Sequence, residues 1–204
     1  VTPWVPGPGG KRVRNPINGI NRWKIFDNLR RSLFPPALVL FLVAGAACGF
    51  GSGLRALLLG FATLFFSPLS DAVTYFTTPP RASRSSLGQV LHSLLRSFAE
   101  AIFLLHYAYV ALDAIVRVWY RRFISHKHFL QWTTAQAVAR MKEKLKKKIL
   151  TELSIVAGLS LLSILFFYSS SGFPFLLPFL ILWSGSPLFA WYLSTPLIAS
   201  SYMH

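Results

Sequence analysis

The sequence has few charged residues, and very few of them are acidic. Only 13% of its 204 residues are charged, and 21 lysines and arginines stand against 6 aspartates and glutamates, which gives a net charge of +15. A soluble domain carries about a quarter charged residues, so this composition argues against a water-soluble globule. Hydrophobic residues make up 53% of the chain. The combination indicates a membrane protein, in which positive charge decides the side that each loop occupies.

Cysteines and recognisable catalytic motifs are also scarce. The single cysteine, Cys48, excludes an internal disulfide framework and a multi-cysteine zinc site. The phosphate-binding loop, the dinucleotide glycine motif, the zinc-protease motif and the nucleophile elbow are absent from the sequence. His126 and His128 have no nearby acid or cysteine to complete a metal set. We therefore expect no catalytic residue, metal site or cofactor in this chain.

Four stretches are long and apolar enough to cross a bilayer as helices, which takes about 20 residues. They are residues 34–50, 54–76, 149–168 and 173–193. Short turns rich in glycine and serine join them in pairs, which predicts two transmembrane hairpins. Pro35 and Pro36 suit the first turn of the first helix, where a backbone N–H has no intrahelical partner. Pro68 and Asp71 are expected to interrupt the second span near its end.

The distribution of the cations predicts the orientation of these hairpins. Seven lysines and arginines precede residue 34, thirteen lie in residues 81–148, and the two short turns contribute only Arg55. Cytoplasmic loops carry the excess of positive charge, so we expect both chain ends and the middle segment on the cytoplasmic side. The lysine run Lys144–Lys148 directly precedes a span, which favours contact with lipid headgroups over nucleic acid.

Residues 87–123, between the hairpins, have the periodicity of an amphipathic helix. Apolar residues recur there at steps of three and four, with basic residues near the end of the segment. This pattern is typical of a helix in the membrane interface. An unbroken helix would be roughly 55 Å long, so we expect a break near Tyr107–Tyr109. The alternative makes Ser97–Val118 a fifth span, at the cost of placing charges within the membrane.

Two carboxylates, Asp71 and Asp113, lie within or beside apolar helix. Carboxylates in such places are functional candidates because they are costly to bury. The alternative, which we favour, is salt bridges from Asp71 to Arg81 or Arg84, and from Asp113 to Arg117 one turn further on.

Together these features predict an all-α membrane protein with two transmembrane helical hairpins joined by amphipathic cytoplasmic interface helices. The chain should consist of a basic cytoplasmic segment, the first hairpin, the interface helices, the second hairpin and a short cytoplasmic tail. Their expected ranges are 1–33, 34–78, 79–148, 149–196 and 197–204. The Pro/Gly-rich start at residues 1–10 suggests the middle of a longer protein.

Residues 20–33 read INRWKIFDNLRRSL, and a second stretch combines LDAIVR at 112–117 with FLQWTTAQ at 129–136. These two stretches resemble those of the cyclic beta-1,2-glucan synthases, which are large bacterial inner-membrane proteins. The resemblance implies the membrane region that follows a processive glycosyltransferase domain. It also implies that the upstream domain holds UDP-glucose with a divalent metal, Mg or Mn, and that this chain scaffolds that domain and the growing glucan at the bilayer.

The candidate sugar-binding residues lie in these stretches or at predicted interfaces. Three of them are tryptophans, because the apolar faces of sugar rings stack on aromatic side chains. The candidates are Trp23, Arg22, Trp119, Trp132, Thr133 and Asp113. Arg30 and Arg31 are candidates for contact with the phosphates of UDP or of lipid headgroups. An interfacial aromatic belt is the alternative explanation for the tryptophans.

Two other functions remain as alternatives. Asp71 and the proline-rich fourth span are compatible with a transporter or channel module. The chain could equally be a purely structural anchor for neighbouring catalytic domains. In every case the expected partners include the phospholipid bilayer and exclude nucleic acid, and the glucan synthase interpretation adds UDP-glucose and glucan.

Overall fold

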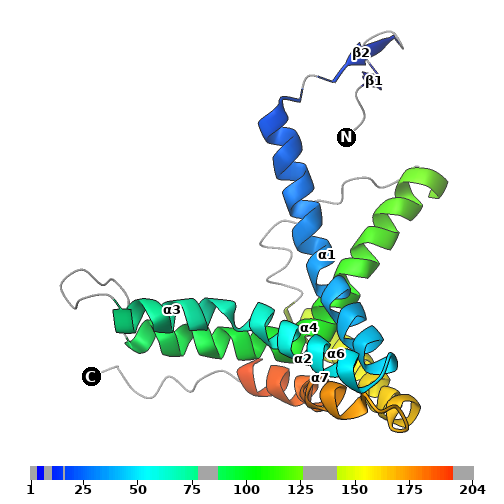
Figure 1. Cartoon of the computed structure of the whole chain (residues 1–204). Helices are drawn as coiled ribbons and strands as arrows, with labels where there is room; N and C mark the ends of the chain where they lie inside the picture. The colour runs from blue at the N-terminus through cyan, green and yellow to red at the C-terminus, as the bar shows by residue number, and fades with distance from the viewer. Residues whose placement is uncertain (1–3, 7–10, 16, 78–86, 126–141, 195–204) are drawn as a thin grey trace, which may run out of the picture.

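The computed structural model describes residues 4–6, 11–15, 17–77, 87–125 and 142–194. A small antiparallel pair of strands, β1 (Trp4–Pro6) and β2 (Arg12–Arg14), precedes a set of helices (Figure 1). The helices are α1 (Gly19–Ala47), α2 (Phe50–Leu64), α3 (Phe66–Thr77), α4 (Leu87–Tyr120), the π-helical turn η2 (Arg121–Ser125), α6 (Lys142–Phe167) and α7 (Phe173–Ser194). The predicted all-α membrane fold is confirmed, although the strand pair was not expected.

Four helices, α1, α4, α6 and α7, are long and apolar enough to cross a membrane. The count rises to five if α2 and α3, which meet at a bend of 60°, form one span. Helix α4 passes this test of length and composition. Both the interfacial interpretation and the fifth span over residues 97–118 therefore fit this helix.

The first helix begins much earlier than its apolar run. The side chain of Asn18 caps it, with the backbone N–H of Asn21 donating to Oδ1 at 2.9 Å. Pro35 and Pro36 consequently lie inside α1, and the prediction that they occupy its first turn is wrong. Prolines are tolerated within membrane helices because neighbouring groups compensate for the lost hydrogen bonds.

The second predicted span is broken, as expected, but the break lies at Phe65 rather than at Pro68 or Asp71. Pro68 is the third residue of α3. A missing N–H costs nothing in the first turn of a helix, so this proline starts a new helix instead of distorting an old one.

The predicted break near Tyr107–Tyr109 does not occur. Helix α4 is continuous from Leu87 to Tyr120, and η2 extends it. No proline or glycine follows Gly88 within these two elements, so the sequence offers none of the usual causes of a break. In Figure 1 the early part of α4 lies alongside α3 and its later part rises away from the body, so the helix changes direction without ending.

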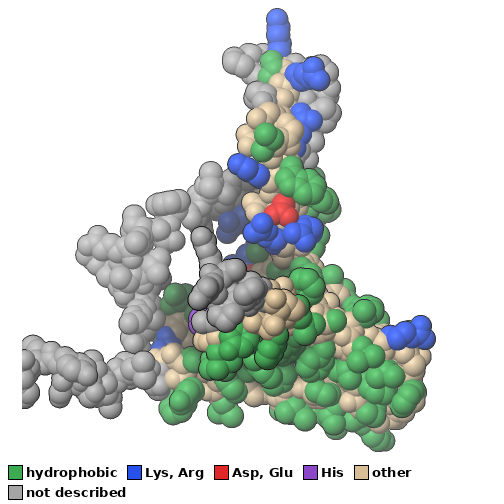
Figure 2. Space-filling model, turned by 60° about the vertical axis from the view of Figure 1, so that its left-hand side comes forward, with side chains coloured by type: hydrophobic (Ala, Val, Ile, Leu, Met, Phe, Trp, Pro, Cys, Tyr) green, Lys and Arg blue, Asp and Glu red, His purple; other side chains and the backbone are tan. Residues whose placement is uncertain are grey.

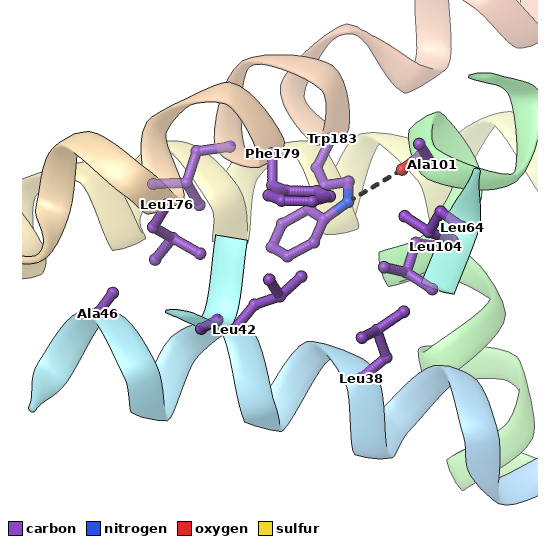
Figure 3. Packing of buried hydrophobic residues seen from close by; sticks show 11 residues of the cluster. Leu38, Leu42, Ala46, Leu64, Ala101, Leu104, Leu176, Phe179 and Trp183 are labelled. Carbon is purple, nitrogen blue, oxygen red and sulfur yellow. Dashed lines mark hydrogen bonds between the residues drawn. The ribbon is translucent and has the colours of Figure 1, made fainter. Parts of the chain in front are cut away.

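The core lies where α1, α2, α4 and α7 meet (Figure 3). Helix α7 contributes its largest side chains, Phe179 and Trp183, both 1% exposed. The remaining members of the cluster are Leu38, Leu42, Ala46, Ala56, Leu64, Ala101, Leu104, Leu176 and Leu180. Helix α6 packs against α7 and buries Leu153, Val156, Ala157 and Ser160, which follow helical spacing.

The two tight turns touch each other. Ser170 Oγ, in the second turn, donates to the carbonyl oxygen of Ala46 at the end of α1, at 2.6 Å. Gly172 lies so close to Ala46 that a Cβ at this position would overlap its backbone. Gly53 of α2 approaches Gly172 in turn. The turns therefore share one end of the bundle, and the side of the membrane on which they lie stays a prediction.

The outer surface is divided between apolar and basic regions. Hydrophobic side chains cover most of the broad body, and lysines and arginines gather mainly on the narrow projection above it (Figure 2). Leu165 and Phe166 of α6 are 69% and 82% exposed. A lipid environment accounts for so much exposed apolar area, which exceeds what a soluble monomer shows.

Candidate functional site at the basic, aromatic end of α1 and α4

The first part of α1 and the last part of α4 project from the body and diverge (Figure 1). Between them is a hollow of about 320 Å³. Leu29 and Ser32 of α1 form one wall, and the other is lined by Ala111, Ala114, Ile115, Val118 and Trp119 of α4. We call this space the α1–α4 hollow.

Trp119 forms part of two hollows. Besides the α1–α4 hollow, it lines an apolar surface hollow of about 510 Å³ together with Ile115, Val116, Tyr120, Phe123 and Ile124. Its ring is 5.2 Å from that of Phe123, and the guanidinium of Arg122 lies 5.9 Å from the same phenyl ring. Trp119 is 65% exposed, so its aromatic face is open to a ligand, and the cation lies beside the neighbouring Phe123.

Trp23 and Arg22 lie near the start of α1. Trp23 is 64% exposed, and its ring is 6.0 Å from that of Phe26. Arg22 Nε donates to the carbonyl oxygen of Ile17 at 3.1 Å. One donor of Arg22 therefore fixes the start of the helix, which reduces what this guanidinium can offer a ligand.

Arg30 and Arg31 share one carboxylate. Arg30 Nη2 lies 2.9 Å from Asp27 Oδ1, and Arg31 Nη2 lies 2.7 Å from Asp27 Oδ2. The hydrogen bond from Arg30, assisted by that from Arg31, holds the pKa of Asp27 below its usual value. The three residues precede the apolar part of α1, and together they present a single net positive charge.

Asp113 is paired with Arg117, whose Nε lies 2.7 Å from Asp113 Oδ2. The salt-bridge interpretation of Asp113 is confirmed. For Asp71, the suggested partners Arg81 and Arg84 lie outside the described residues.

Other sequence-derived candidates also fall outside the described part of the chain. They are Trp132, Thr133, His126 and His128. Among the residues that the structure does describe, no group of three histidines, cysteines or acids could hold a metal ion.

The sequence did not point to Trp183, which joins two helices in the core. Its indole Nε1 donates to the carbonyl oxygen of Ala101 in α4 at 3.2 Å (Figure 3). The available signal was a tryptophan in the middle of a span, because a buried indole N–H needs a partner. The sequence cannot say which carbonyl on another helix accepts that bond.

The comparisons with known proteins bear on these observations. No family model matches the chain. The cyclic beta-(1,2)-glucan synthase NdvB of Rhizobium meliloti (strain 1021) is 34% identical over 197 residues, which cover 89% of this chain and 7% of that protein. The chain is therefore similar to part of one cyclic beta-1,2-glucan synthase. It spans only a small part of NdvB, and its described residues include four helices long and apolar enough to cross a membrane.

Proposed function

We propose that this chain is the membrane portion of a processive glycosyltransferase that makes cyclic beta-1,2-glucan from UDP-glucose. Its role is to scaffold the catalytic domain and the acceptor glucan at a bacterial inner membrane, with both ends of the chain in the cytoplasm. The similarity to NdvB carries this proposal. The catalytic residues and the divalent metal, Mg or Mn, then belong to an upstream transferase domain.

The basic, aromatic end suits the handling of glucan. Trp119 presents a broad apolar face that a sugar ring can cover, and Phe123 limits its motion, which lowers the entropy lost on binding. The nearby guanidinium of Arg122 can donate hydrogen bonds to hydroxyl or phosphate oxygens. Trp23 offers a second exposed ring on α1. We infer that both tryptophans position the growing chain.

The full-length enzyme provides the test, with Trp119→Ala, Trp23→Ala and Trp132→Ala as variants. Each of the first two should lower glucan formation from labelled UDP-glucose roughly three- to tenfold, since a lost aromatic contact has that size of effect. Trp132→Ala tests the second tryptophan of the family-like stretches and should lower synthesis in the same way. The assay compares membranes that contain equal amounts of the protein.

Trp191→Ala is the matched control. Trp191 is a similarly exposed tryptophan, at 58%, near the end of α7 and outside the hollows lined by Trp119. Its loss should leave synthesis unchanged. Full synthesis by all three test variants would remove the assignment of the site. A wild-type protein that moves solute but neither binds UDP-glucose nor makes glucan would instead support the transporter alternative.

A further inference from the structure

A polar stripe runs along the second half of α4. His106, Tyr109, Asp113 and Arg117 follow one another at spacings of three and four residues, which places them on one face of the helix. Most residues between them are alanine or branched aliphatic residues. Polar groups are costly in a helix of such composition unless polar partners meet them.

Helix α6 brings one further charged group to this stripe, Glu152, which is itself paired with Lys148. It packs against α4, and its Glu152 is near enough to His106 and Arg117 to interact electrostatically with both. Lys148 lies one turn before Glu152, and its Nζ is 3.7 Å from Glu152 Oε1. We call the six residues the polar seam: His106, Tyr109, Asp113, Arg117, Lys148 and Glu152.

One atom of the polar seam lacks a hydrogen-bond partner. In the described part of the chain, His106 Nδ1 is a buried side-chain nitrogen with no hydrogen bond. Buried polar atoms are nearly always paired, so an unpaired one indicates that a ligand or a water completes the site. A hydroxyl group both donates and accepts, and it therefore satisfies this nitrogen in either tautomer of the ring.

The charges of the polar seam offset one another. Asp113 pairs with Arg117 and Glu152 with Lys148, so two carboxylates balance two cations. A phosphate would be attracted by the cations but repelled by both carboxylates. A neutral polyhydroxyl ligand meets no such repulsion, and carboxylates are strong acceptors for hydroxyl groups. The side chains of Asp113 and Arg117 are 38% and 58% exposed, which leaves them accessible to a ligand.

We propose that the polar seam binds the hydroxyl groups of a neutral glucan chain, with His106 and Glu152 as contact residues. From His106 to Arg117 the stripe extends roughly 16 Å along the helix, enough for several hydroxyl groups. The inference rests on the proposed function, because that function supplies the polyhydroxyl ligand. It adds a second contact surface, separate from the rings of Trp119 and Trp23.

The test measures binding of a linear beta-1,2-linked glucose oligomer to the detergent-solubilised full-length protein by calorimetric titration. His106→Phe keeps an aromatic ring and removes both nitrogens, and Glu152→Gln keeps the shape of the side chain and removes its charge. Each should weaken binding about five- to tenfold, the size expected for a lost hydrogen bond. The KM for UDP-glucose should not change, whereas a merely structural defect would alter both quantities.

Two matched controls lie on the early part of α4, outside the polar seam. His92→Phe changes an exposed histidine, and Glu100→Gln changes a carboxylate paired with Arg96 at 3.0 Å. Both should bind the oligomer as the wild type does. If His106→Phe fails to fold, Glu152→Gln still decides the matter from the other helix.

Equal oligomer affinity in the wild type and in the polar-seam variants would overturn the inference. Equal weakening by the control variants would also overturn it, because the effect would then not belong to the polar seam. Synthesis from UDP-glucose by the wild type tests the proposed function, and oligomer binding by the variants tests the polar seam, so the two can fail separately.

Discussion

The two ends of the helix bundle are built in opposite ways. At the turn end, small residues and a serine hydroxyl bring backbones into contact, as Gly172 and Ser170 do against Ala46. At the other end α1 and α4 diverge, and large side chains such as Trp23 and Trp119 remain 64% and 65% exposed. Close backbone contacts characterise the turn end, whereas charged side chains and exposed aromatic rings characterise the other end.

This difference follows from the solvent around each end. Lipid tails are as apolar as leucine, so helices in a bilayer associate through tight packing of small residues rather than through hydrophobic burial. Exposed tryptophans and arginines suit the membrane interface, where rings and cations meet headgroups. Substitutions at the turn end should therefore reduce stability, whereas substitutions at the basic end should change binding and leave the fold intact.

The largest effect is expected at Gly172. In Gly172→Ala the new Cβ would overlap the backbone of Ala46, which cannot move aside as a flexible side chain can. Overpacking of this kind costs about 3 kcal/mol at the upper end of its usual range. Denaturant unfolding of the full-length protein in detergent would measure the loss.

Gly158→Ala is the control for that substitution. A Cβ at Gly158, inside α6, would meet nothing within 4 Å. The variant should gain about 0.5–1 kcal/mol, because alanine is favoured over glycine within a helix. If the two variants were equally stable, close contact at the turn end could not be what holds the hairpins together.

A smaller effect is expected from Trp183→Phe. The change removes the indole N–H that donates to Ala101 and leaves unfilled space beside a side chain that is only 1% exposed. The Ala101 carbonyl also lies within a helix, so the expected loss of unfolding free energy is modest, about 1–2 kcal/mol. Trp191→Phe, at an exposed position, should change stability by less than about 0.5 kcal/mol. Equal losses in both variants would contradict a role for the Trp183 hydrogen bond.

Local signals in the sequence were sufficient for much of the fold. Long apolar runs and glycine-rich turns predicted both hairpins, and the four-residue spacing of Asp113 and Arg117 predicted their salt bridge. Errors arose where two local signals competed. Pro35 and Pro36 are strong markers of a helix start, but the cap at Asn18 sets the start of α1.

The site was less predictable, because it depends on where helices cross. Sequence periodicity placed Trp119 at an interface, but the α1–α4 hollow requires Leu29 and Ser32 from a helix some eighty residues earlier in the chain. The hydrogen-bond partner of Trp183 likewise lies on another helix. Contacts between distant helices leave no periodic trace in a single sequence, so they could not be predicted.

Asp27→Asn is expected to have the smallest effect on stability. Because Asp27 lies at the basic end, this substitution also gives the clearest contrast with those at the turn end. Exposed ion pairs add little to stability, so unfolding near neutral pH should not change measurably. Because the pKa of Asp27 is lowered, its carboxylate is charged and paired with Arg30 and Arg31 at every pH above 3.8, its ordinary pKa. The pairing is lost only as the pH falls through the lowered pKa. The substitution should therefore mimic strong acid at this one position.

Two cations then lose their shared counter-charge, and the full-length protein in zwitterionic nanodiscs should bind a fluorescent anionic lipid about fivefold more strongly. High salt should abolish this gain, because the charges are exposed and screened. Glu100→Gln frees Arg96 in the same way on the early part of α4, away from the basic end. An equal gain in that variant would mean that the position of the cation is unimportant, and the basic end would lose its distinct role in contacting anionic groups.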